Sequence, residues 1–171
     1  FREFSQVTDF KGTSFSTGDV VHHEPHVNLS TFTVGTGNYS EGIYHWGVRA
    51  YLDGETETLI SKRKFFIDTT RPNKPLLIAP APGGTSQPPG EIIFTWSNNG
   101  NDPGIIHSPI TAIIEIADDQ NFTLNLETYE VAGTTTAISM LGTGNRYWRV
   151  RNKDGAGNES AYSEPGNFSL F

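Results

Sequence analysis

Apolar and polar residues alternate along several short segments of the chain, which is the pattern of β-strands. In residues 42–50, Tyr44, Trp46 and Val48 alternate with polar or small residues, and the same period of two appears at 92–96, 110–116 and 138–140. Because successive side chains of a strand point to opposite faces, each segment is predicted to be half-buried, with Ile113 and Glu115 on an exposed face. We therefore expect strands that pack face to face in a β-sandwich.

One of these strands occurs twice. Residues 42–50 and 144–152 have Gly, Trp, Val and Arg at the same four positions, and their tryptophans, Trp46 and Trp148, lie 102 residues apart. An aromatic segment follows each strand, at 65–67 and at 168–170. A repeat of this period indicates a structural unit of about 100 residues. The chain is therefore predicted to hold two tandem β-sandwiches, residues 1–70 and residues 71–171.

Composition supports the all-β class and limits the range of functions. The 18 Gly and 10 Pro, with 12% aromatic and only 18% charged residues, suit short strands and tight turns rather than surface helices. The net charge of −7 and the scattered Lys and Arg argue against nucleic acid as a partner. No apolar stretch approaches the ~20 residues of a membrane span, and the lack of Cys excludes disulfides and thiolate chemistry.

Three segments of the second unit resemble fibronectin type III domains, particularly those of bacterial and archaeal surface proteins and secreted glycosidases. They are residues 91–96, which end in Trp96, residues 110–122, with the turn Asp118-Asp119-Gln120-Asn121-Phe122, and residues 147–163, with the turn Asp154-Gly155-Ala156-Gly157-Asn158. The resemblance covers residues 72–171. It implies a seven-stranded sandwich in which these segments form strands B, C, F and the start of G.

The first unit resembles the same family only in its second half, through residues 42–50 and 65–70. Residues 1–7 then correspond to strand C, so the resemblance implies a sandwich that lacks strands A and B. Tyr44, two residues before Trp46, matches the tyrosine corner of the family, whereas Arg146 stands at this position in the second unit.

A sandwich without strands A and B would leave one sheet face, around Trp46, without a cover. Three explanations stay open. The chain is a piece of a longer array whose preceding residues complete the unit, another copy supplies the missing strands by β-addition, or residues 1–40 have an unusual fold.

The densest polar cluster of the sequence is a candidate zinc site. In an extended segment, His22, Glu24 and His26 would project to one side, and imidazole and carboxylate groups are ligands of zinc. Pro25 interrupts any regular strand there, and the spacing matches no established metal motif. The alternative interpretation is a solvated loop.

A second candidate metal site lies where the loop 98–102 is expected near the connector 68–73. Asp68, Asn101 and Asp102 offer the carboxylate and amide oxygens that calcium prefers. The alternative is that the Asn and Gly residues of this loop are present because turns require left-handed backbone conformations. Pro72 and Pro75 restrict the backbone of the connector and favour an extended, semi-rigid segment.

No arrangement of residues suggests an enzyme. Carboxylates that could catalyse glycoside hydrolysis have no evident partners, and the Gly-x-Ser-x-Gly, His-Glu-x-x-His and phosphate-binding glycine motifs do not occur. Five Asn-x-Ser/Thr triplets are candidates for glycosylation in a glycosylating host. They begin at Asn28, Asn38, Asn121, Asn158 and Asn167.

The sequence therefore favours a non-catalytic structural module, a spacer or adhesion segment of a longer extracellular surface, filament or secreted multidomain protein. Its expected partners are neighbouring domains or another copy of the chain, and glycans or another cell-surface protein. One alternative is a carbohydrate-contacting module of a secreted glycosidase, with Tyr39, Tyr51, Tyr129 and Tyr162 stacking on sugar rings. Another is a filament subunit joined by strand exchange. No cofactor is expected apart from calcium.

Overall fold

The computed structural model describes residues 3–11, 20–24, 39–52 and 55–171, and all regular secondary structure in these residues is β-strand. Within this described part, no helix is long and apolar enough to cross a membrane. The chain divides into two compact units, Phe1–Thr69 and Thr70–Phe171. The prediction of an all-β protein is confirmed.

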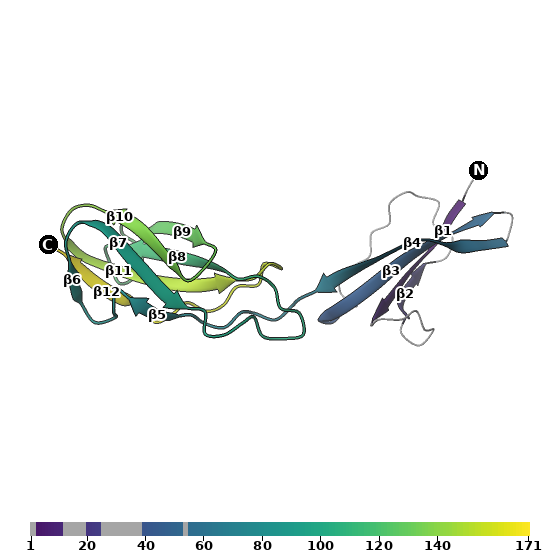
Figure 1. Cartoon of the computed structure of the whole chain (residues 1–171), viewed down its shortest axis with the longest axis horizontal. Helices are drawn as coiled ribbons and strands as arrows, with labels where there is room; N and C mark the ends of the chain where they lie inside the picture. Colours follow the sequence, from purple (N-terminus) through teal and green to yellow (C-terminus); the bar gives the residue numbers. More distant parts are fainter. Residues whose placement is uncertain (1–2, 12–19, 25–38, 53–54) are drawn as a thin grey trace. The chain divides into compact units, whose positions relative to one another are not determined.

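The described strands of the first unit form one antiparallel sheet in the order β2-β1-β3-β4 (Figure 1). Their bounds are Glu3–Lys11 for β1, Val20–Glu24 for β2, Gly42–Leu52 for β3 and Glu55–Ile67 for β4. Trp46 lies in the central part of β3, where it pairs with Asp9 of β1 and with Arg63 of β4. Trp46 is half-buried in this unit.

Tyr44 makes the contact that the tyrosine-corner resemblance implies. Its hydroxyl donates to the backbone oxygen of Ser40 at 2.7 Å, four residues upstream. The ring is buried and stacks on Phe65, with centroids 5.4 Å apart, while Tyr39 meets it edge-on at 5.0 Å. The start of β3 is therefore held by one hydrogen bond and a small aromatic cluster.

The second unit consists of two sheets. The smaller has the order β10-β7-β5 and the larger has the order β6-β12-β11-β8-β9 (Figure 1). Their bounds are Leu76–Ala79 for β5, Thr85–Gln87 for β6, Gly90–Ser97 for β7, Thr111–Ala117 for β8, Glu127–Val131 for β9, Thr135–Met140 for β10, Gly144–Lys153 for β11 and Gly166–Leu170 for β12. All neighbouring strands are antiparallel except β6 and β12, which are parallel.

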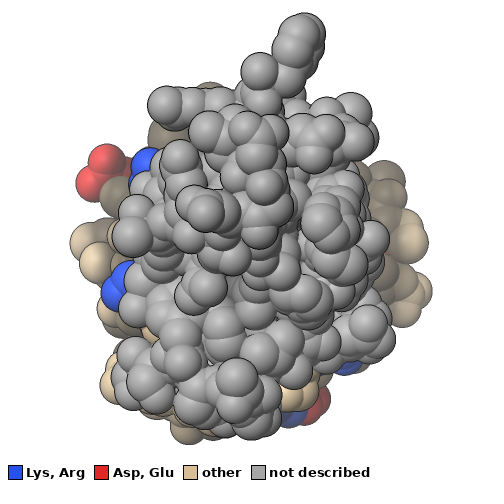
Figure 2. Space-filling model, turned by 90° about the vertical axis from the view of Figure 1, so that its right-hand side faces the viewer, with Lys and Arg blue, Asp and Glu red and all other residues tan. Residues whose placement is uncertain are grey.

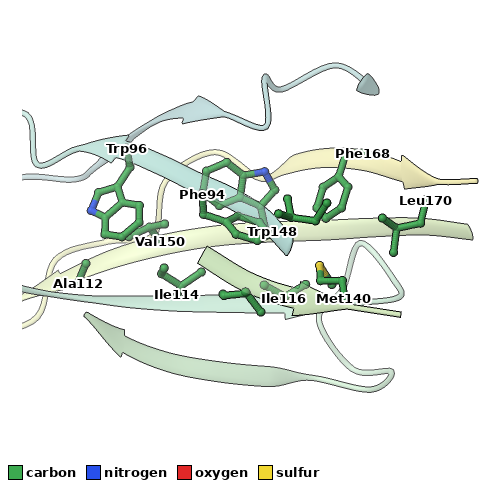
Figure 3. Close-up of a cluster of buried hydrophobic side chains, with 12 residues drawn as sticks. Phe94, Trp96, Ala112, Ile114, Ile116, Met140, Trp148, Val150, Phe168 and Leu170 are labelled. Carbon is green, nitrogen blue, oxygen red and sulfur yellow. The ribbon is translucent and has the colours of Figure 1, made fainter. Parts of the chain in front are cut away.

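The core of the second unit lies between these sheets and is centred on Trp148 (Figure 3). Trp148 of β11, Phe94 of β7 and Phe168 of β12 are each 0% exposed. Phe94 meets both other rings edge-on, at centroid distances of 5.1 Å from Trp148 and 5.8 Å from Phe168. The alternation of apolar residues in β7 and β11 thus predicted the inward face correctly, and the unit is a β-sandwich.

The prediction that Ile113 and Glu115 lie on an exposed face is wrong. They are 4% and 8% exposed, so β8 is buried on both of its faces. The cause is tertiary: Arg149 of the neighbouring strand β11 donates from Nε to Glu115 Oε2 at 2.8 Å, and the Tyr162 hydroxyl donates to Glu115 Oε1. The side chains of Arg149 and Tyr162 therefore lie over the face of β8 that the alternation predicts to be exposed.

Candidate functional site

Two carboxylates of the second unit form an acidic group. Oxygens of Asp102 and Asp154 lie within 4.8 Å of each other. Asp102 belongs to the loop between β7 and β8, and Asp154 directly follows β11. Asp102 and Asp154, both in the second unit, are only 2% and 5% exposed. Buried acidic groups this close together are uncommon away from cations, because burial and mutual repulsion both penalise the charged forms.

Asp102 is positioned by a tightly folded loop. The loop turns at Asn99 and Gly100, whose φ angles of 58° and 103° lie in the left-handed region that Asn and Gly tolerate. Asp102 Oδ2 accepts a hydrogen bond from the Ser108 backbone N–H at 2.9 Å. Its backbone oxygen lies 2.6 Å from Nδ1 of His107. The carboxylate is thereby fixed at the base of the loop.

Asp154 is positioned by the turn that follows β11. Its Oδ1 accepts the backbone N–H groups of Ala156 at 2.9 Å and Asn158 at 2.8 Å, and its Oδ2 accepts from Asn158 Nδ2 at 2.8 Å. Gly157, with φ of 93°, completes the turn. The segment 154–158 is therefore a turn, as its composition predicts, and the same carboxylate that organises this turn also belongs to the acidic group.

Asn152, at the end of β11, carries a buried amide between the same segments. It is 0% exposed, and its Nδ2 donates to the backbone oxygens of Asn73 at 2.9 Å and Asn98 at 3.3 Å. Its Oδ1 is buried and has no hydrogen-bond partner. Burying an oxygen without a hydrogen-bond partner costs free energy. A hydrogen-bond donor or a cation beside Asn152 Oδ1 would reduce this cost.

Of the predicted calcium ligands, Asp68 directly follows β4, Asn101 is exposed, and Asp102 is buried in the acidic group. The predicted calcium site stays a prediction. Asp154 and Asn152 were not among the predicted ligands, because they lie about 50 residues from Asp102 in the sequence and only the fold brings them near it. The only sequence signal for Asp154 is its place in the Asp-Gly-Ala-Gly-Asn turn.

The other predicted site residues are spread over the chain. His22 and Glu24 lie in β2, paired with Asp9 and Val7 of β1, and His26 lies outside the described residues. The zinc site therefore stays a prediction. Of the glycosylation candidates, Asn28 and Asn38 also lie outside the described residues, Asn121 is exposed, and Asn158 and Asn167 are half-buried.

A second polar cluster covers the outer face of the larger sheet. The guanidinium of Arg149 lies between the rings of Phe122 and Tyr162, 4.0 Å and 3.9 Å from their centroids, and forms an ion pair with Glu115 at 2.6 Å. Burial, and then the hydrogen bond to Glu115, raise the pKa of Tyr162. These groups satisfy one another, so the cluster stabilises the sheet and offers no free acid, base or nucleophile.

The tyrosines proposed as a sugar-stacking surface do not share one face in the second unit. Tyr129 packs against the core from β9, whereas Tyr162 lies over Arg149 on the outer face of the sheet. Tyr129 and Tyr162 therefore form no common stacking platform. In the view of Figure 2, the visible Lys and Arg side chains lie apart from one another.

No protein-family model and no curated protein matches the chain. Among solved structures, the fibronectin(III)-like modules of Clostridium thermocellum CbhA match 99% of this chain and 78% of their own length, with 14% identity and a TM-score of 0.52. The fibronectin type III domain of human fibronectin type III domain containing protein 3 matches 61% of this chain and 90% of its own, with 17% identity and a TM-score of 0.45. The FN1-FN3 domains of chicken CNTN1 match 98% of this chain, which covers 57% of theirs, with 12% identity and a TM-score of 0.43.

At such identities a structural match shows the fold and leaves the function open. This chain has the fibronectin type III-like β-sandwich fold.

Proposed function

We propose that the chain is a non-catalytic spacer or adhesion module of a longer extracellular multidomain protein. The observation that carries this proposal is the path of the chain through the second unit. Asn73, just ahead of β5, is held by Asn152 at one end of β11, and Leu170, next to the last residue, pairs with Gly144 at the other end. The chain thus enters and leaves this unit at opposite ends (Figure 1).

This path gives the second unit a defined length. Asn152 and Gly144 are eight residues apart along β11, which corresponds to about 27 Å at the rise of about 3.4 Å per residue of an antiparallel strand. The close-packed core between the two sheets keeps this length constant. A module of this kind separates its neighbours by a fixed step.

Two further observations support a structural role over a catalytic one. Several titratable groups of the second unit pair with one another, as in the Glu115–Arg149 and Arg151–Glu159 ion pairs. The matched CbhA structure, with a TM-score of 0.52, consists of fibronectin(III)-like modules of a bacterial protein. Extracellular location is part of the proposal and rests on the fold and on the five glycosylation triplets.

A distance measurement on the full chain tests the spacer role. Because the chain has no Cys, spin labels can be attached specifically to Arg71→Cys and Phe171→Cys, both of which are exposed. Double electron–electron resonance should give one narrow distribution, centred near the length of β11 plus the reach of the labels. A broad distribution that extends to short distances would contradict a rigid spacer.

A further inference from the structure

The end of the second unit where β11 finishes carries an arrangement that its structural role does not require. Asp102 and Asp154 place buried carboxylate oxygens within 4.8 Å of each other. A spacer gains nothing from concentrating negative charge in buried loops, since like charges at this distance destabilise the folded state.

Asn152 supplies a second, independent observation. Its amide nitrogen is fixed by two backbone oxygens, those of Asn73 and Asn98, and this leaves its Oδ1 buried without a hydrogen-bond partner. Asn98 lies in the loop that carries Asp102. Asp154 follows Asn152 by two residues, so the side chains of Asn152 and Asp154 lie on the same side of the extended chain. The unpaired oxygen therefore lies among the segments that supply the carboxylates.

We propose that Asp102, Asp154 and Asn152 bind a divalent cation, and that this cation is calcium. All the donor atoms are oxygens, which suits a hard cation and disfavours zinc or copper. Calcium is commonly bound by several protein oxygens, whereas magnesium dehydrates reluctantly and usually keeps several water ligands. Two buried carboxylates and a buried amide oxygen therefore favour calcium.

Hydrogen bonds hold both carboxylates in place for this role. Asp102 Oδ2 accepts the Ser108 N–H at 2.9 Å, and Asp154 Oδ2 accepts an N–H of the Asn158 side chain at 2.8 Å. The ion would neutralise the buried charge and stabilise the loops at this end of the second unit. The proposed spacer role does not depend on it.

Calorimetric titration of the full chain with calcium chloride, after treatment with EDTA, tests the proposal. We expect one site that binds calcium at least tenfold more tightly than magnesium, and a melting temperature of the second unit that rises with calcium concentration because the ion binds only the folded state. Asp102→Asn and Asp154→Asn should each weaken calcium binding at least tenfold.

Asp119→Asn is the matched control. Asp119 also organises a turn of the second unit, since its carboxylate accepts backbone N–H groups of Thr123 at 2.8 Å and Leu124 at 2.7 Å, but it is not a member of the acidic group. This variant should lower stability without changing calcium affinity. Circular dichroism verifies that each variant is folded before titration. The proposal is overturned if the wild type binds no calcium at 10 mM, binds magnesium equally well, or keeps its affinity in both site variants.

Discussion

Phe94 and Trp148 join the two sheets of the second unit through an edge-to-face contact, with ring centroids 5.1 Å apart and ring planes at 73°. Phe94 lies in β7 of the smaller sheet and Trp148 in β11 of the larger one. Both rings are fully buried, so this pair holds the sandwich together at its centre.

The first prediction concerns this contact. Phe94→Ala should lower the free energy of unfolding of the second unit by about 3–5 kcal/mol, because it removes a buried ring and leaves a cavity between the sheets. Urea unfolding followed by Trp fluorescence measures the loss. Phe171→Ala, at a position that is 70% exposed, is the control and should change stability by less than about 0.5 kcal/mol. Equal losses in the two variants would contradict the core described above.

The second prediction concerns the close approach of β12 to Trp148. A Cβ atom at Gly166 would lie 2.7 Å from Trp148 Nε1 and 3.1 Å from Leu77 Cδ1. Gly166→Ala should therefore destabilise the second unit by about 1–3 kcal/mol, since the core has no room for the added methyl group. Thermal unfolding measures the effect. At Gly155 the nearest atom to an added Cβ is Pro109 Cδ at 3.3 Å, so Gly155→Ala should be clearly milder, and a reversed order of the two variants would refute the prediction.

The third prediction concerns the tyrosine corner of the first unit. Tyr44→Phe removes the hydroxyl that donates to the Ser40 backbone oxygen but keeps the buried ring. The first unit should lose about 1 kcal/mol of stability, the typical contribution of one hydrogen bond. Hydrogen exchange of amides in β3 and β4 measures it. Arg146→Lys, at the corresponding position of the second unit, should leave exchange in the first unit unchanged.

The fourth prediction concerns a titration. The Tyr129 hydroxyl donates to Glu127, and this hydrogen bond is the main reason that its pKa is raised from 10.0 to about 12. A raised pKa in the folded state means that the contact stabilises the fold below about pH 10 and that this stabilisation is lost as the pH rises toward 12. Ultraviolet absorbance of tyrosinate, compared between wild type and Tyr129→Phe, isolates this group. Glu127→Gln should move the transition back toward pH 10, and an unchanged transition would contradict the assignment.

Local sequence patterns predicted much of the fold, because the alternation of a strand depends only on residues that are close together in the sequence. The alternation in β7 and β11 marked Phe94 and Trp148 as inward, and the repeat of the strand around Trp46 indicated two units. Alternation failed at β8, where Ile113 and Glu115 are both buried and Glu115 bonds to Arg149 of β11 and to Tyr162. No local pattern contains that information, since the covering residues lie more than 30 positions away in the sequence.

At the candidate site, too, the sequence predicted the local turns but not the contacts between them. By itself, the sequence determined the sandwich class, the two-unit repeat and the turns around Asp102 and Asp154, because alternation and the left-handed preferences of Gly and Asn are local properties of the chain. Only the tertiary structure decided that these two turns meet, that Asn101 stays exposed while Asp154 joins Asp102, and that Asn152 is buried beside the segments that carry them. The reason is physical: strand pairing and sheet packing bring together residues about 50 positions apart, and those contacts are set by the whole core rather than by any one segment.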